Sequence, residues 1–126
     1  MTLGQMIGML KKCDNPKAVV FFDFGELVPT GLHSYRGFYD HLAFSFDRRW
    51  TFNGKDEKDN EIDVAGLLKM CEDALGRTFQ GYKGGDYVMN PDTPLWVSDY
   101  ADASSTAVVA VLDEETRVII QTAYRP

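Results

Sequence analysis

The amino-acid sequence predicts an α+β fold: an antiparallel or mixed sheet of about five strands with two amphipathic helices packed on it. Apolar residues recur with helical spacing in two segments, 3–10 and 64–75, whereas β-branched and aromatic residues dominate five others. The resulting order, α-β-β-α-β-β-β, does not alternate regularly between helices and strands. A chain of 126 residues, 44% of them hydrophobic, fits a single domain, residues 1–126.

The first half of the chain supplies one helix and two strands. Thr2 and Gln5 have the spacing of a capping box, and residues 14–16 (Asp-Asn-Pro) end the helix that follows. Residues 18–24 predict a largely buried strand, and residues 25–32, with Pro29 and two glycines, predict a loop. Residues 41–47 alternate apolar with small or polar side chains and predict a second strand. The apolar helix face consists of Leu3, Met6, Ile7 and Leu10.

The second half begins with a polar stretch, residues 53–60, which predicts a solvated hairpin tip or a flexible loop. Asp63 is expected to cap a second helix, and Gly76 stands where a left-handed residue ends it. Short strands follow at residues 94–98, 106–112 and 117–122, the last two joined by a hairpin. The apolar face of this helix is expected to consist of Val64, Leu67, Leu68, Cys71 and Leu75.

Composition excludes several classes of function. The net charge of −6 disfavours binding to duplex nucleic acid or to an anionic membrane, although a few local cations can hold a small anion. Residues 1–12 lack the apolar core of a signal peptide and no run is long enough to span a bilayer, so we expect a cytoplasmic protein. Cys13 and Cys71 lie on apolar helix stripes and predict buried free thiols. We expect no metal and no cofactor, because two cysteines and two histidines show no zinc spacing.

The strongest candidate binding segment is residues 33–40. It places the guanidinium of Arg36 among the rings of Tyr35, Phe38 and Tyr39. Arginine offers a planar fork to phosphate, and aromatic rings stack on bases. The structural alternative is an aromatic entry to a strand, with Arg36 paired to an acid such as Asp40.

Three further segments carry candidate ligand-binding groups, each with a structural alternative. Residues 81–87 are glycine-rich, so backbone N–H groups can approach an anion. The spacing is not that of a P-loop, and a tight turn before a strand is the simpler explanation. Residues 89–96 hold amide and carboxylate groups that can read hydroxyls or a base edge, or simply form a proline-rich turn. The tail is expected to be held at a sheet edge. The candidates in these segments are Tyr82, Lys83, Gly84, Gly85, Asn90, Asp92, Tyr124 and Arg125.

The sequence predicts no catalytic residue and no enzyme. His33 and His41 are isolated, and His41 faces away from Leu42 in the predicted strand, as a surface residue does. The chain contains no nucleophile elbow and no histidine pair at helical spacing. A binding function therefore fits better than a catalytic one.

Three strings together, residues 23–25, 34–43 and 76–87, resemble phage- and prophage-encoded proteins of the Thoeris anti-defence type. The resemblance covers residues 3–125. It implies a sponge that binds a cyclic ADP-ribose isomer, an immune messenger, without cleaving it in the infected cell. It also implies a homodimer or higher homo-oligomer with pockets between protomers, and binding of cyclic oligonucleotides in some relatives.

Two other functions remain open at this point. The first is a phage protein that inhibits a host protein by direct binding, because residues 56–63 form an acidic block that can dock on a basic partner. The second is a small nucleotide hydrolase. The acids of the block are Asp56, Glu57, Asp59, Glu61 and Asp63.

Overall fold

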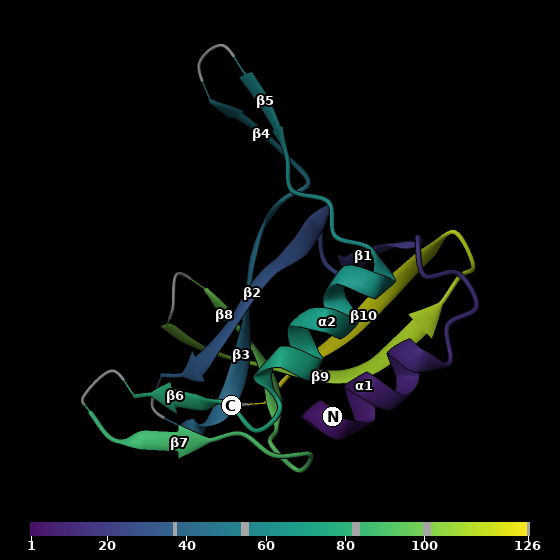
Figure 1. Ribbon diagram of the computed structural model, residues 1–126. Coiled ribbons are helices and arrows are strands. Elements are labelled where there is room, and N and C mark those ends of the chain that lie inside the picture. The colour runs from purple at the N-terminus through teal and green to yellow at the C-terminus, as the bar shows by residue number, and fades with distance from the viewer. Residues whose placement is uncertain (37, 54–55, 82–83, 100–101, 126) are drawn as a thin grey trace.

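The computed structural model describes residues 1–36, 38–53, 56–81, 84–99 and 102–125, with side chains for the same ranges apart from 50–53, 56–59, 99, 102 and 103 (Figure 1). Two helices, α1 (Leu3–Lys11) and α2 (Val64–Ala74), lie within these ranges together with ten strands. The strands are β1 (Val19–Phe22), β2 (Leu27–Tyr35), β3 (Phe38–Arg48), β4 (Trp50–Asn53), β5 (Asp56–Asp59), β6 (Thr78–Gln80), β7 (Asp86–Val88), β8 (Leu95–Asp99), β9 (Asp102–Asp113) and β10 (Arg117–Tyr124).

The sequence left open an antiparallel or a mixed sheet of about five strands. The main sheet is mixed and has six strands. Their order is β1-β10-β9-β8-β3-β2. The pairs β1–β10 and β3–β8 are parallel, and the other three pairs are antiparallel. The α+β class predicted from the element order is confirmed.

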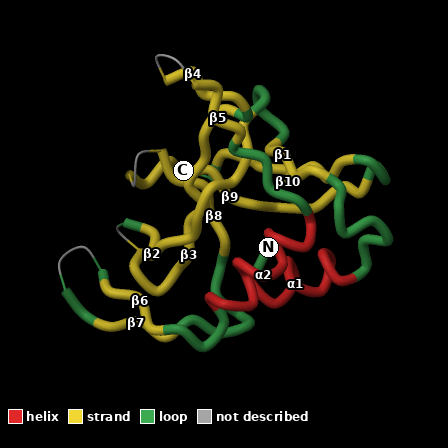
Figure 2. The backbone as a smooth tube through the Cα atoms, turned by 45° about the horizontal axis from the view of Figure 1, so that its top comes forward, coloured by secondary structure: helices red, strands yellow, loops and turns green. Residues whose placement is uncertain are grey.

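The sheet curves into a nearly closed barrel around its apolar face. Phe22 of β1 meets Phe44 and Phe46 of β3 edge to face, with ring centroids 6.2 Å apart in each pair. These contacts set the edge strand β1 against β3, the neighbour of the opposite edge strand β2. Both helices lie on the same side of the sheet (Figure 2), so one face of most strands packs in the core and the opposite face is free of helices.

The helices begin where the sequence predicts. The Thr2 hydroxyl accepts from Gln5 N, and the Gln5 side chain accepts from Thr2 N, so the capping box is confirmed. Asp63 accepts from Gly66 N at 2.7 Å, and Gly76 has a φ of +78° just beyond α2. The four apolar residues expected on α1 are buried. The prediction for Leu75 is wrong: α2 ends at Ala74 and Leu75 is exposed.

The expected loop at residues 25–32 is also wrong over most of its length, because β2 begins at Leu27. A proline inside a strand argues for a loop, since it cannot donate to a ladder. Here Pro29 lies on an edge strand of the main sheet, and the register shifts between Pro29 and Gly31. An edge position with a bulge tolerates the missing N–H group.

Two short hairpins complete the fold. The polar stretch, residues 53–60, includes the last residue of β4 and all of β5, and residues 54 and 55 lie outside the described part of the chain. The antiparallel pair β4–β5 projects away from the helices in Figure 1 and favours the hairpin over the flexible loop. The glycine-rich segment joins β6 to β7. Cys71 is buried and Cys13 half-buried, and both thiols are free. In the part of the chain that the structure describes, neither helix is long and apolar enough to cross a membrane.

Candidate functional site

One end of the β2–β3 pair gathers two of the segments expected to bind a ligand. The turn that contains Arg36 joins β2 to β3 at this end. The β6–β7 hairpin lies beside the turn, because Tyr87 of β7 stacks on Tyr39 of β3 with ring centroids 6.0 Å apart. Figures 1 and 2 both show the hairpin next to β2 and β3. Residues far apart in the sequence are therefore neighbours here.

Four near-parallel rings, the ring cluster, lie at this end: Tyr35, Phe38, His41 and Trp96. Tyr35 stacks on Trp96 with centroids 5.2 Å apart and 9° between the planes, and Phe38 stacks on His41 at 5.5 Å and 22°. Tyr35 and Phe38 are 6.1 Å apart, and His41 and Trp96 are 6.2 Å apart. Each ring thus touches two others, so the planes are held mutually parallel.

Strand pairing explains why His41 and Trp96 belong to this cluster. Leu42 of β3 pairs with Leu95 of β8, and both side chains are buried in the core. Successive residues of a strand point to opposite faces. His41 and Trp96 consequently lie on the helix-free face, as the sequence predicted for His41, but against each other rather than in open solvent.

The cluster has a rigid side and an open side. Tyr35 is 1% exposed, and its hydroxyl accepts a hydrogen bond from Ser105 N at 3.0 Å. Ser105 O in turn accepts from Arg125 N, which ties the C-terminal tail to the cluster. Phe38, by contrast, is 57% exposed. Phe38 therefore offers ring surface that the protein itself leaves uncovered.

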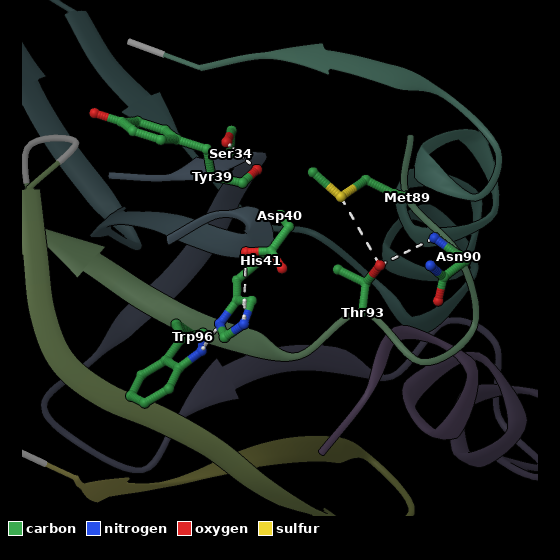
Figure 3. Close-up of polar contacts among 8 residues, drawn as sticks. All are labelled: Ser34, Tyr39, Asp40, His41, Met89, Asn90, Thr93 and Trp96. Carbon is green, nitrogen blue, oxygen red and sulfur yellow. Dashed lines mark hydrogen bonds and ion pairs between the residues drawn. The ribbon is translucent and has the colours of Figure 1, made fainter. Parts of the chain in front are cut away.

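A hydrogen bond fixes the imidazole of His41. Trp96 Nε1 donates to His41 Nδ1 at 2.9 Å (Figure 3). An indole N–H only donates, so the Nδ1 atom that faces it carries no proton, and the neutral ring carries its proton on Nε2. The Asp40 carboxylate lies 3.8 Å from that Nε2 atom. Asp40 thus lies beside His41.

The glycine-rich hairpin packs tightly against β3. A Cβ atom at Gly81 would lie 3.0 Å from Gly84 O and 3.0 Å from Tyr39 Cγ, so only glycine fits without movement. Gly84 and Gly85 are exposed, with φ values of +94° and +92° that favour glycine. Ser34 Oγ donates to Tyr39 O at 2.5 Å and braces the same strand end (Figure 3). The candidates Tyr82 and Lys83 lie outside the described residues.

Asn90 and Asp92 lie elsewhere, in a turn that supports the start of α1. Asn90 Oδ1 accepts from Asp92 N, and Thr93 Oγ1 accepts from Asn90 N. The same turn accepts the N–H groups of Leu3 and Gly4 through Thr93 O and Pro91 O. The structural alternative given for this segment, a proline-rich turn, thus has a defined role.

The two tail candidates differ in their surroundings. Tyr124 is 70% exposed. The charge of Arg125 acts on the α-amino group of Met1, whose pKa is lowered first by burial and then by this guanidinium. Arg125 therefore lies near the start of α1 as well as beside Ser105.

Beyond the ring cluster, the β2–β3 pair holds a histidine with a shifted pKa and, at its far end, a hollow. Burial lowers the pKa of His33, which lies on β2. Among the described residues, no group of three or more His, Cys, Asp or Glu side chains is arranged to hold a metal ion. A hollow of about 440 Å³ lies at the opposite end of the β2–β3 pair, lined by Gly25, Glu26, Leu27, Arg48 and Arg49.

Trp96, Ser105 and Tyr87 are site residues that the sequence analysis missed, and His41 was assigned to the surface. Strand alternation placed His41 and Trp96 away from the core, but nothing in the sequence pairs two residues 55 positions apart.

The protein matches no family model, no curated protein and no solved structure.

Proposed function

We propose that the protein binds and sequesters a cyclic nucleotide messenger, a cyclic ADP-ribose isomer, without cleaving it. The observation that carries this proposal is the ring cluster, which ends in the exposed ring of Phe38. A preformed aromatic surface stacks on a base, and this stacking contributes about 1–3 kcal/mol per base. The rings are already parallel, so little ordering is needed on binding.

Phosphate groups find partners next to this surface. Arg36 follows Tyr35 directly and is exposed. The exposed glycines Gly84 and Gly85 lie in the hairpin that packs on Tyr39. Gly84 N already donates to Gly81 O at 3.0 Å, so the guanidinium of Arg36 and the exposed backbone of Gly85 are the groups that suit a pyrophosphate, despite the overall charge of −6. A ligand with a base on one side and a pyrophosphate on the other thus fits these three elements.

The resemblance to Thoeris anti-defence proteins supports the same class of ligand. It also leads us to propose a homodimer or higher homo-oligomer in the cytoplasm of an infected cell, with pockets between protomers. Size-exclusion chromatography with light scattering tests the assembly. A monomer at micromolar concentration would contradict this part of the proposal.

The test of function is a thermal-shift screen against cyclic ADP-ribose isomers and cyclic dinucleotides, followed by calorimetry. A ligand at 100 times its Kd stabilises the folded state by about 2.7 kcal/mol, which raises the melting temperature by several degrees. Heating the complex and chromatographing the supernatant should return the messenger intact. A hydrolysed product would instead support the nucleotide hydrolase, and no shift with any compound would refute the proposal.

Variants locate the site. Phe38→Ala should weaken binding about 5- to 150-fold, which corresponds to the stacking energy above. Arg36→Ala should weaken it by roughly 2–5 kcal/mol if the phosphate is desolvated. The control is Leu112→Ala, which removes an exposed apolar side chain near the β9–β10 hairpin. Equal losses in all three variants would contradict the assignment of the site.

Direct inhibition of a host protein is distinguished by the acidic block of residues 56–63. Replacing Asp56, Glu57 and Asp59 of β5 by their amides should leave messenger binding unchanged, because β5 projects away from the end of β2 and β3 that lies beside the β6–β7 hairpin (Figure 1). Glu61 and Asp63 are kept, because Glu61 pairs with Arg49 and Asp63 caps α2. If the same substitutions abolish capture of a host protein in a pull-down, the result would favour direct inhibition of that protein.

A further inference from the structure

Asp40 and His41 offer a hydrogen-bond acceptor and a hydrogen-bond donor side by side, close enough for an ion pair but not for a hydrogen bond to each other. The Asp40 Oδ1 and His41 Nε2 atoms are 3.8 Å apart, which exceeds hydrogen-bond distance. The side chain of Asp40 is 73% exposed and that of His41 is 23% exposed. The carboxylate accepts hydrogen bonds, and the Nε2–H group donates one. Among the residues that the structure describes, neither atom has a hydrogen-bond partner.

The donor is fixed in place rather than free to rotate. Trp96 Nε1–H holds the Nδ1 side of the imidazole, and the Phe38 ring stacks on its face. Rotating the imidazole by 180° would leave the indole N–H without its acceptor, which disfavours that rotamer when the group is partly buried. Trp96 is therefore a positioning residue that acts through His41.

We infer that Asp40 and His41 bind the hydroxyl groups of a ribose. This inference rests on the proposed function, because it takes Phe38 as the surface on which the base stacks. His41 lies one ring layer beneath Phe38, so a base on the outer face cannot meet the imidazole edge in its own plane. A sugar attached to that base can reach down past the edge of Phe38. The carboxylate then accepts from one hydroxyl, and Nε2–H donates to the oxygen of its neighbour.

The choice of a vicinal diol follows from the chemistry of the pair. A phosphate would be repelled by the Asp40 carboxylate, whereas a hydroxyl can both donate and accept. Hydrogen bonds to a charged acceptor discriminate strongly against an analogue that lacks the donor, because the acceptor is then left unpaired. The site should accordingly distinguish ribose from deoxyribose.

The experiment measures Kd by calorimetry for the cyclic ADP-ribose isomer that gives the largest thermal shift. It repeats the measurement with the two analogues of that isomer in which one ribose or the other is replaced by 2′-deoxyribose. The wild-type protein should bind one of the analogues at least about tenfold more weakly. Asp40→Ala, which removes the acceptor, should reduce this ratio to near one. Asp40→Asn keeps an acceptor without its charge, and Trp96→Phe keeps a ring without its N–H group, so each should reduce the ratio in part.

The control is Asp86→Asn, which makes the same change at an exposed acid of β7 and should leave the ratio at its wild-type value. If the role of Asp40 is purely structural, its substitution should weaken binding of the parent isomer and of the analogues by the same factor and leave the ratio of their Kd values unchanged, which would overturn the inference. If the wild-type protein binds the parent isomer and both analogues with equal affinity, this inference is overturned while the proposed function stands. Absence of binding to any isomer overturns the proposed function and this inference with it.

Discussion

Replacing Tyr35 by phenylalanine tests whether the ring cluster is anchored by its hydroxyl group. Tyr35 is 1% exposed, and its Oη atom accepts from Ser105 N at 3.0 Å across a sequence separation of 70 residues. Tyr35→Phe keeps the stacked ring and removes only the acceptor. A buried N–H group without a partner costs about 1–3 kcal/mol. Because Ser105 is half-buried, we expect a loss at the lower end, about 1–2 kcal/mol.

Urea denaturation and a thermal melt measure this loss. For a domain of this size the melting temperature should fall by roughly 3–8 °C. Tyr124→Phe is the matched control, since Tyr124 is 70% exposed and its change should stay within about 0.5 kcal/mol of wild type. A Tyr35→Phe protein as stable as the Tyr124→Phe protein would show that the hydroxyl anchors nothing.

Substitutions at four further residues test the helices and the core. Gly8→Ala should raise the free energy of unfolding by about 0.5–1 kcal/mol, because a Cβ atom at Gly8 in α1 meets nothing within 4 Å. Gly4→Ala should lower the free energy of unfolding by roughly 1–3 kcal/mol in the same urea assay, because its Cβ atom would lie 2.9 Å from Pro91 O. Asp63→Ala should lose about 1 kcal/mol of stability and Asp63→Asn much less, since asparagine also caps. Burial raises the pKa of Cys71 to about 12, so the unfolded thiol ionises first and stability should fall as pH rises from about 9 towards 12. Urea melts at about pH 8 and pH 10 should show a smaller fall in Cys71→Ala, and an equal fall would contradict this account.

Local signals were enough to predict the helices. The capping box at Thr2, the cap at Asp63 and the left-handed Gly76 each involve residues within a few positions of one another. Helical periodicity identified the buried face of α1 completely and failed only at Leu75, one residue beyond the last turn of α2. Element boundaries are the least determined part of such a pattern.

The arrangement of the sheet could not be predicted from local sequence, because it depends on contacts between residues far apart in the chain. The Pro29 bulge is tolerated because β2 is an edge strand, and edge position depends on pairings that the local sequence does not encode. The parallel pair β3–β8 joins residues more than 50 positions apart, and it is this pair that sets His41 against Trp96. Isolated segments of the sequence suggest Tyr35, Arg36 and Phe38 as candidates, but they do not reveal the residues from other strands that arrange these side chains.

The division between buried and exposed rings decides how binding and stability should separate. Tyr35 is buried and its ring contacts both Trp96 and Phe38, so its substitution should act first on folding. Phe38 has an exposed ring, so Phe38→Ala removes little buried area and should act mainly on affinity. A ligand surface assembled in this way needs no rearrangement before it binds, which favours tight binding of a small molecule. Loss of stability in Phe38→Ala as large as in Tyr35→Ala would mean that the outer ring belongs to the core, and the surface for a base would then disappear.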